Sequence, residues 1–203
     1  MSVPLSAIVP PQPTEIDQRV LLHGVSWEDY EAILAIRGEA LVPRMTYLEG
    51  ELELMSPSVD HEGLKKRLAR LIEAFAEERG ITLEGFGSWT VRSKPKRRGA
   101  EADECYILGV PESEPIRPDI AIEVVWTSGG LSKLEVYRGL AVPEVWIWQD
   151  STLSFHILTA GDYASKPHSD LLPNLDPELL TRCMAAPSQT QAVMDLRRAL
   201  QMS

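Results

Sequence analysis

The sequence RPDIAIEVVWTSGGLSKLEVYRGLAVPEVWIWQ, residues 117–149, decides the fold of this chain. Residues 119–126 alternate with the period of two that is typical of a β-strand. One face of this strand is apolar, whereas the opposite face carries the carboxylates of Asp119 and Glu123. A carboxylate on a half-covered central strand is costly unless a cation, a hydrogen-bond donor or water lies close to it. We therefore take Glu123 as a candidate site residue, with a solvated or salt-bridged strand acid as the alternative.

The second half of this segment predicts a short helix and another strand. A glycine pair at 129–130 precedes a helix that carries Lys133 near its start, and the apolar residues 145–148 follow as a strand. Because both faces of that strand are apolar, we expect them to join the core or to form a subunit contact. A lysine at the start of a short helix is often only a solvated surface residue, so its role depends on what it faces.

The rest of the chain favours a single domain of the α+β (mixed α/β) class around one central sheet. Ser26 is expected to cap a first helix, and Asp60 is expected to cap a long amphipathic helix over 61–79. Residues 1–20 form a proline-rich lead-in, and residues 21–203 form the domain. The other expected elements are a hairpin over 46–55, strands over 81–86, 89–91, 102–107 and 153–158, and helices over 177–185 and 188–200.

The charge balance limits the partners that the sequence suggests. A formal net charge of −10 disfavours broad, non-specific nucleic-acid binding, which depends on cations that neutralise phosphates. The basic run Arg92–Arg98 is a local exception, and it is either a solvated hairpin tip or a loop that contacts phosphate. No apolar run approaches the roughly 20 residues that span a bilayer, and no signal peptide is evident. We therefore expect a cytoplasmic protein without membrane contacts.

Distance decides which acids can share a metal ion. Asp119 and Glu123 lie on one strand face but about 13 Å apart at roughly 3.3 Å per residue, which is too far for one ion. Asp103 belongs to another strand, and if the two strands are neighbours, facing Cβ atoms lie about 5 Å apart. Two such carboxylates suit Mg²⁺, which completes its shell with water and phosphate oxygens. Glu62 on the long helix and Lys133 could join this group, the lysine to orient or deprotonate an attacking water.

Several longer segments resemble a known family. The segment 118–148, with LEGELELMSPS at 48–58, HEGLKKRL at 61–68 and EADECYIL at 101–108, resembles the Uma2 (also called DUF820) group. Members of this group are similar to endonucleases and have the PD-(D/E)xK restriction-endonuclease-like fold. The resemblance covers roughly residues 46–158, which include the whole proposed core. It implies a central mixed sheet flanked by helices, with an N-terminal helix and hairpin and C-terminal helices.

The resemblance implies roles for four residues. Asp103 matches the acid of the first family motif, although Ala102 stands where a proline is common. Glu123 matches the acid of the (D/E)xK motif, whose lysine should fall at position 125, where this chain has a valine. Lys133 on the following helix is therefore the matching lysine. Glu62 would be the helix carboxylate that approaches the metal, although an acid in the first turn is also favoured by the helix dipole.

We therefore expect an endonuclease that depends on Mg²⁺ or Mn²⁺ and hydrolyses phosphodiester bonds in DNA. Asp103, Glu123 and Glu62 would bind the metal, and together with Lys133 they would form the catalytic group. The alternative is a catalytically inactive, homodimeric binding or regulatory module on the same fold, since a fold alone never establishes an activity. Homodimer formation is a further expectation.

Overall fold

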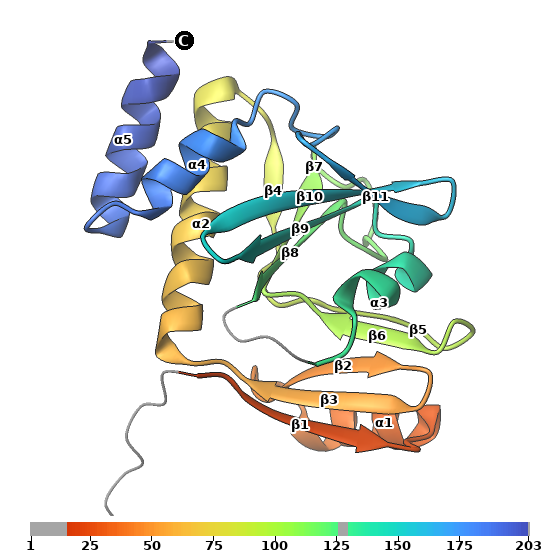
Figure 1. Ribbon diagram of the computed structural model, residues 1–203. Helices are drawn as coiled ribbons and strands as arrows, with labels where there is room; N and C mark the ends of the chain where they lie inside the picture. Colours follow the sequence, from red (N-terminus) through yellow and green to blue (C-terminus); the bar gives the residue numbers. More distant parts are fainter. Residues whose placement is uncertain (1–15, 126–129, 203) are drawn as a thin grey trace, which may run out of the picture.

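The first of two β-sheets is antiparallel and contains the predicted hairpin (Figure 1). The structure is a computed structural model that describes residues 16–125 and 130–202. The strands of this sheet are, in spatial order, β1 (Gln18–His23), β3 (Glu51–Ser56), β2 (Arg44–Leu48), β6 (Arg98–Glu101) and β5 (Thr90–Ser93). The turn between β2 and β3 is the expected one, because Glu49 and Gly50 both have positive φ angles, 49° and 108°.

The second sheet is mixed and contains the strand that carries Glu123. Its strands are, in spatial order, β11 (Asp162–Lys166), β10 (Thr152–Thr159), β9 (Glu144–Gln149), β8 (Ile120–Val125), β7 (Glu104–Leu108) and β4 (Leu83–Gly85). The parallel neighbours β8 and β9 are joined through α3 (Lys133–Leu140), whereas β7 pairs with β8 in the antiparallel direction. A helical crossover is what a parallel pair requires.

The helices and the two sheets are arranged in layers. The helices α2 (Val59–Arg79), α4 (Pro177–Met184) and α5 (Gln189–Gln201) lie on one side of the second sheet, and α3 lies between the two sheets (Figure 1). The helix α1 (Trp27–Arg37) packs on the first sheet through a cluster that includes Tyr30 and Tyr47. The layer around α3 buries Val136 and Tyr137 against both sheets. The α+β class is therefore confirmed, but with two sheets where one central sheet was expected.

The helix ends follow from local chemistry. Ser26 caps α1 as predicted, since its hydroxyl accepts a hydrogen bond from the Asp29 N–H at 3.0 Å and its own N–H donates to the Asp29 carboxylate. The cap predicted at Asp60 is wrong. Ser58 caps α2, because its extended backbone lets its hydroxyl accept from the His61 N–H at 3.2 Å. Asp60 instead lies in the first turn.

Two strand boundaries differ from the expectation. The strand β1 starts inside the lead-in expected over residues 1–20, because residues 18–23 pair antiparallel with β3. The strand expected over 102–107 starts two residues later than predicted, as β7 at Glu104, and the residues before it, 98–101, form β6 in the other sheet. Asp103 lies where the chain crosses from one sheet to the other. The strand β11 was not anticipated.

The strands around Glu123 are more deeply buried than expected. Residues 120–124 of β8 are buried on both faces, because α3 covers the face that was predicted to be half open. Val145 and Trp146 are fully buried, so the strand 145–148 belongs to the core. Of the two expectations for this strand, the core is observed, and its buried face offers no surface for a subunit contact. In the described part of the chain no helix is long and apolar enough to cross a membrane.

Candidate active site

Glu123 is held by two side chains of α3. Glu123 is buried, with its side chain 5% exposed, and its Oε2 lies 3.3 Å from the Lys133 Nζ. The Tyr137 hydroxyl donates a hydrogen bond of 2.5 Å to Oε1. Lys133 and Tyr137 are four residues apart, so both point from the same face of the helix. Burial, together with the charge of Glu123, raises the pKa of Tyr137 well above its usual value, which keeps the hydroxyl protonated and able to donate.

The start of α3 places Lys133 against Glu123. Ser132 caps the helix by accepting a hydrogen bond from the Glu135 N–H at 3.3 Å, and Lys133 is the first helical residue. The expected proximity of Lys133 and Glu123 is therefore observed. The sequence did not single out Tyr137, although its spacing of four residues from Lys133 was a usable signal.

Asp103 directly precedes β7, the strand that pairs with β8, so it lies close to Glu123 as the distance argument required. Glu104 pairs with Ile122, so Asp103 is opposite Glu123 one step further along, and its N–H donates to the Ile122 carbonyl at 3.2 Å. Its own carboxylate, however, is engaged elsewhere. Oδ2 accepts from the Val124 N–H at 2.6 Å, while Oδ1 contacts other side chains.

Arg44 on β2 joins two of the predicted carboxylates. Its guanidinium forms ion pairs with Asp103 and with Glu62, and its side chain is 5% exposed. Glu62 is 41% exposed and also pairs with Lys65 at 2.7 Å. Burial would raise the pKa of Glu62, but the positive charges of Lys65 and Arg44 outweigh it, so the pKa is lowered. Asp103 and Glu62 thus both form ion pairs with one side chain of the protein, Arg44.

His61 extends this buried network to the N-terminal strand. Its Nε2 lies 3.1 Å from the Asp103 Oδ1 and its Nδ1 lies 3.0 Å from the Asp17 Oδ2. Burial lowers the pKa of His61, although the charge of Asp17 opposes that effect. Asp17 also accepts a hydrogen bond of 2.9 Å from the Ser58 N–H. His61 is therefore a buried bridge between two acids.

A pocket of about 220 Å³ opens beside Glu123. We call it the Glu123 pocket, and its polar lining residues include Arg19, Glu53, Glu123 and Lys133. The backbone around residues 131–132 forms another part of its wall. Neither Asp103 nor Glu62 lines it. Arg19 comes from β1 and Glu53 from β3, so the first sheet supplies one side of the pocket, while β8 and α3 supply the other.

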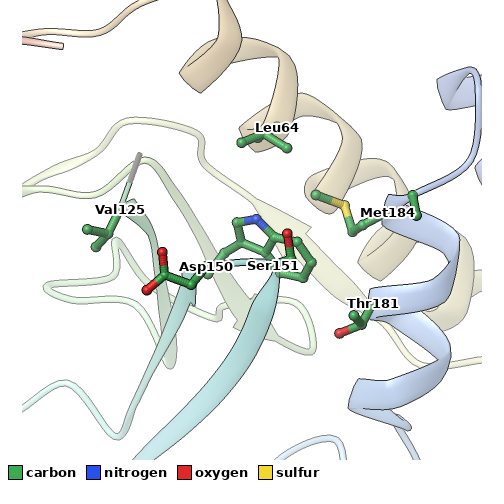
Figure 2. Close-up of a pocket in the computed structure, with 8 residues that line it drawn as sticks. Leu64, Val125, Asp150, Ser151, Thr181 and Met184 are labelled. Atoms are coloured by element: carbon green, nitrogen blue, oxygen red, sulfur yellow. The ribbon is translucent and has the colours of Figure 1, made fainter. Parts of the chain in front are cut away.

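A second pocket, of about 340 Å³, meets the Glu123 pocket at Val125, which lines both. Its lining includes Leu64 and Met184 on the helix side and Asp150 and Thr181 among the polar groups (Figure 2). None of the four predicted site residues lines it. Among the described residues that line it, Asp150 is the only carboxylate and none is a lysine or arginine, so this part of the pocket lacks the acid and lysine combination that phosphodiester chemistry calls for.

Comparison with known proteins agrees with the resemblance seen in the sequence. The Uma2 family, described as "Putative restriction endonuclease", matches residues 27–193. The chain belongs to this family. Among solved structures, the chain is similar to a "putative nuclease belonging to DUF820" from Anabaena variabilis ATCC 29413. That similarity has a TM-score of 0.46 at 15% sequence identity and covers 76% of this chain and 92% of the other. No curated protein matches the chain.

A Uma2 protein with this pocket could bind a hard cation through Glu123, but the predicted three-acid set is not assembled. Within residues 16–125 and 130–202, no group of three or more histidines, cysteines or acids is placed to hold a metal. Two of the three predicted acids are engaged by the protein itself, because Asp103 and Glu62 both form ion pairs with Arg44. Mg²⁺ can be bound by one or two carboxylates plus water and phosphate oxygens, which the Glu123 pocket has room to provide. The chemistry of the donors therefore fits Mg²⁺ or Mn²⁺.

Two other predicted features have structural partners. The Asp119 carboxylate accepts a hydrogen bond of 2.9 Å from the Leu108 N–H, which secures β7 and agrees with its exclusion from the metal set. In the basic run, Arg92, Lys94 and Arg98 pair with acids at 3.3, 3.1 and 2.9 Å. This run forms the β5–β6 hairpin, at the opposite edge of the first sheet from β1. These contacts favour the hairpin-tip interpretation.

Proposed function

We propose that this protein is an endonuclease that hydrolyses phosphodiester bonds in DNA with the help of Mg²⁺ or Mn²⁺. The observation that supports this most is the approach of Lys133 Nζ to the Glu123 carboxylate, 3.3 Å, in a pocket with further charged groups. A buried acid beside a lysine is the pair that the family motif contains, here with the lysine on the next helix. Membership of the Uma2 family supports the same class of reaction.

In this proposal the side chains of the Glu123 pocket have separate tasks. When bound, a divalent ion would supply positive charge against the negative charge that develops on the phosphate. Glu123 would hold that ion, and Tyr137 would keep the Glu123 carboxylate in place through its hydrogen bond. Lys133 would orient the attacking water and relay its proton. The water oxygen would bond to phosphorus as the bond to the leaving oxygen breaks, and the proton that the water gives up through Lys133 would end on the leaving oxygen. Arg19, on the opposite wall, would contact non-bridging phosphate oxygens.

Asp103 and Glu62 remain predicted metal ligands, on the condition that Arg44 releases them. Both carboxylates pair with Arg44. Either acid would therefore have to exchange the guanidinium for the metal ion. The Arg44 guanidinium and a divalent ion are both cations that can pair with these two carboxylates. The ion can replace the guanidinium only if the Arg44 side chain moves away.

Cleavage of plasmid DNA by the purified protein tests the proposal. We expect nicking of supercoiled plasmid with Mg²⁺ or Mn²⁺, none in EDTA, and recovery of activity when Mn²⁺ is added back in excess. Single-stranded DNA and RNA should be assayed in parallel to define the substrate. A protein that is folded by circular dichroism but cleaves none of these nucleic acids with either metal would contradict the proposal, as would cleavage unaffected by EDTA.

One observation favours the alternative of a non-catalytic homodimeric module. Both oxygens of Asp103 already have protein partners, as they would in a site whose acid serves stability. Homodimer formation stays a proposal in either case, and it needs a surface other than the buried strand 145–148. Light scattering of the purified protein decides this point, because a monomer at working concentration would exclude the dimer.

A further inference from the structure

Glu53 is a buried acid of the Glu123 pocket that is not one of the residues of the (D/E)xK motif. It lies on β3 and is 3% exposed. Its Oε2 accepts a hydrogen bond of 3.1 Å from the Leu131 N–H. Burying a carboxylate is costly unless donors compensate for the lost water, so this hydrogen bond is a substantial part of what keeps Glu53 in place. The bond also crosses between layers, because β3 belongs to the first sheet and Leu131 precedes α3.

Gly130 shows how closely the backbone approaches this carboxylate. A Cβ added at Gly130 would overlap the Glu53 Oε2 and would lie 3.0 Å from its Cδ. The same Cβ would lie 3.3 Å from the Arg19 Nη1. Gly130 also has a φ of +97°, which side chains disfavour. Only glycine therefore lets the chain pack directly on Glu53.

The anchored backbone leads straight to the lysine of the site. Leu131 is two residues before Lys133, and Ser132 between them is the cap of α3. Glu53 thus holds the segment from one side, while the Ser132 cap fixes where the helix begins. Lys133 Nζ meets Glu123 only if the first turn of α3 stays where it is. A shift of about 1 Å in a catalytic group can cost on the order of 10²-fold in rate.

We propose that Glu53 is a positioning residue of the endonuclease. By accepting the Leu131 N–H and packing on Gly130, it fixes the first turn of α3 and keeps Lys133 against Glu123. This inference rests on the proposed function, because it assigns Glu53 a task in the same reaction. The acceptor oxygen of Glu53 performs this task, and its negative charge is secondary.

Two substitutions of Glu53 distinguish the role of its acceptor oxygen from the role of its negative charge. Glu53→Gln keeps an acceptor oxygen for Leu131 but removes the charge, whereas Glu53→Ala removes both. We expect Glu53→Ala to lower kcat by about 10- to 10²-fold with KM within about threefold, and Glu53→Gln to recover most of the lost rate. Glu53→Ala in a Lys133→Ala background should cause little further loss, because Glu53 acts through Lys133. A merely structural role would give additive losses.

A matched glycine pair tests the close approach at residue 130. Gly161 has a φ of +93°, similar to that of Gly130, but nothing lies within 4 Å of a Cβ built there. The variants Gly130→Ala and Gly161→Ala therefore carry a similar backbone strain, and only the first collides with Glu53. We expect Gly130→Ala to lower kcat as Glu53→Ala does, while Gly161→Ala keeps the wild-type rate. Equal rates in the two variants would contradict the proposal.

Hydrogen exchange of the Leu131 amide tests the anchor without any substrate. In the wild type and in Glu53→Gln this amide should exchange slowly, and in Glu53→Ala it should exchange as fast as an exposed loop amide. If wild type cleaves nucleic acid and Glu53→Ala cleaves equally well, the inference is wrong and the proposed function stands. If wild type does not cleave, the proposed function fails, and the assigned catalytic task of Glu53 fails with it. If Glu53→Gln is as inactive as Glu53→Ala, the charge matters and Glu53 is not an anchor.

Discussion

The variant Glu123→Gln is expected to lose metal-dependent cleavage by at least about 10²-fold in kcat, because it loses the charge that would bind the ion. The substitution is nearly isosteric. The Tyr137 hydroxyl can still donate to the amide oxygen, so the fold around β8 should persist. The loss should therefore appear in kcat of a protein that stays folded, although the lost ion pair with Lys133 also lowers the melting temperature. Initial rates on supercoiled plasmid in Mn²⁺, with thermal unfolding of the same samples, provide the measurement.

Glu135→Gln is the matched control for this variant. Glu135 also lies near the start of α3, but its side chain is 45% exposed and pairs with Arg138 at 3.8 Å. Removing its charge should change the cleavage rate little, since it does not line the Glu123 pocket. If Glu123→Gln cleaved as fast as Glu135→Gln, the activity would come from a contaminant or from another site, and the role assigned to Glu123 would be wrong.

Arg44→Met is expected to lower the free energy of unfolding by about 3–5 kcal/mol, the usual cost of breaking a buried ion pair from one side. Arg44 is 5% exposed and pairs with Asp103, which is 1% exposed. Without the guanidinium, Asp103 keeps only the Val124 N–H and His61 as partners, and its charge is left in a poorly solvated place. Urea unfolding at pH 7 measures the difference.

Two further variants show whether burial causes this effect. Arg138→Met removes an arginine that is 44% exposed and pairs with Asp162 at 3.0 Å, and it should cost less than about 1 kcal/mol. The double variant Arg44→Met/Asp103→Asn removes both charges, so it should be more stable than the sum of the two single losses predicts. A loss for Arg44→Met as small as that for Arg138→Met would mean that the buried pair contributes little.

Local patterns were sufficient to predict much of the frame of the site. The hairpin turn at Glu49-Gly50, the cap at Ser26 and the long helix before Gly80 depend on neighbouring residues, and all three are present. The alternation in 119–126 predicted a strand, which is observed as β8. The sequence argument supposed that the strands near Asp103 and Glu123 are neighbours, and β7 and β8 do pair. Lys133 near Glu123 came from the family resemblance, because a lysine at the start of a helix has no local signature of its own.

The parts that could not be predicted depend on contacts between distant segments. Arg44 reaches Asp103 across 59 positions, the difference of their residue numbers, and no periodic pattern indicates such a pair. Glu53 looked like one more alternating residue of a hairpin, and its partner Leu131 is equally remote in sequence. The assignment of β6 and β7 to different sheets also depends on contacts between distant segments. The chain leaves one sheet for the other at Asp103, and side-chain alternation continues through the crossing.

Binding of Mn²⁺ to the wild type and to Glu123→Gln, measured side by side by calorimetry, tests the central claim most directly. That claim is that Glu123 holds a divalent ion in the pocket that Lys133 also lines. We predict a saturable Mn²⁺ site in the wild type whose affinity falls at least about tenfold in Glu123→Gln and is unchanged in Glu135→Gln. Equal Mn²⁺ affinity in the wild type and Glu123→Gln, with both proteins folded, would contradict the account.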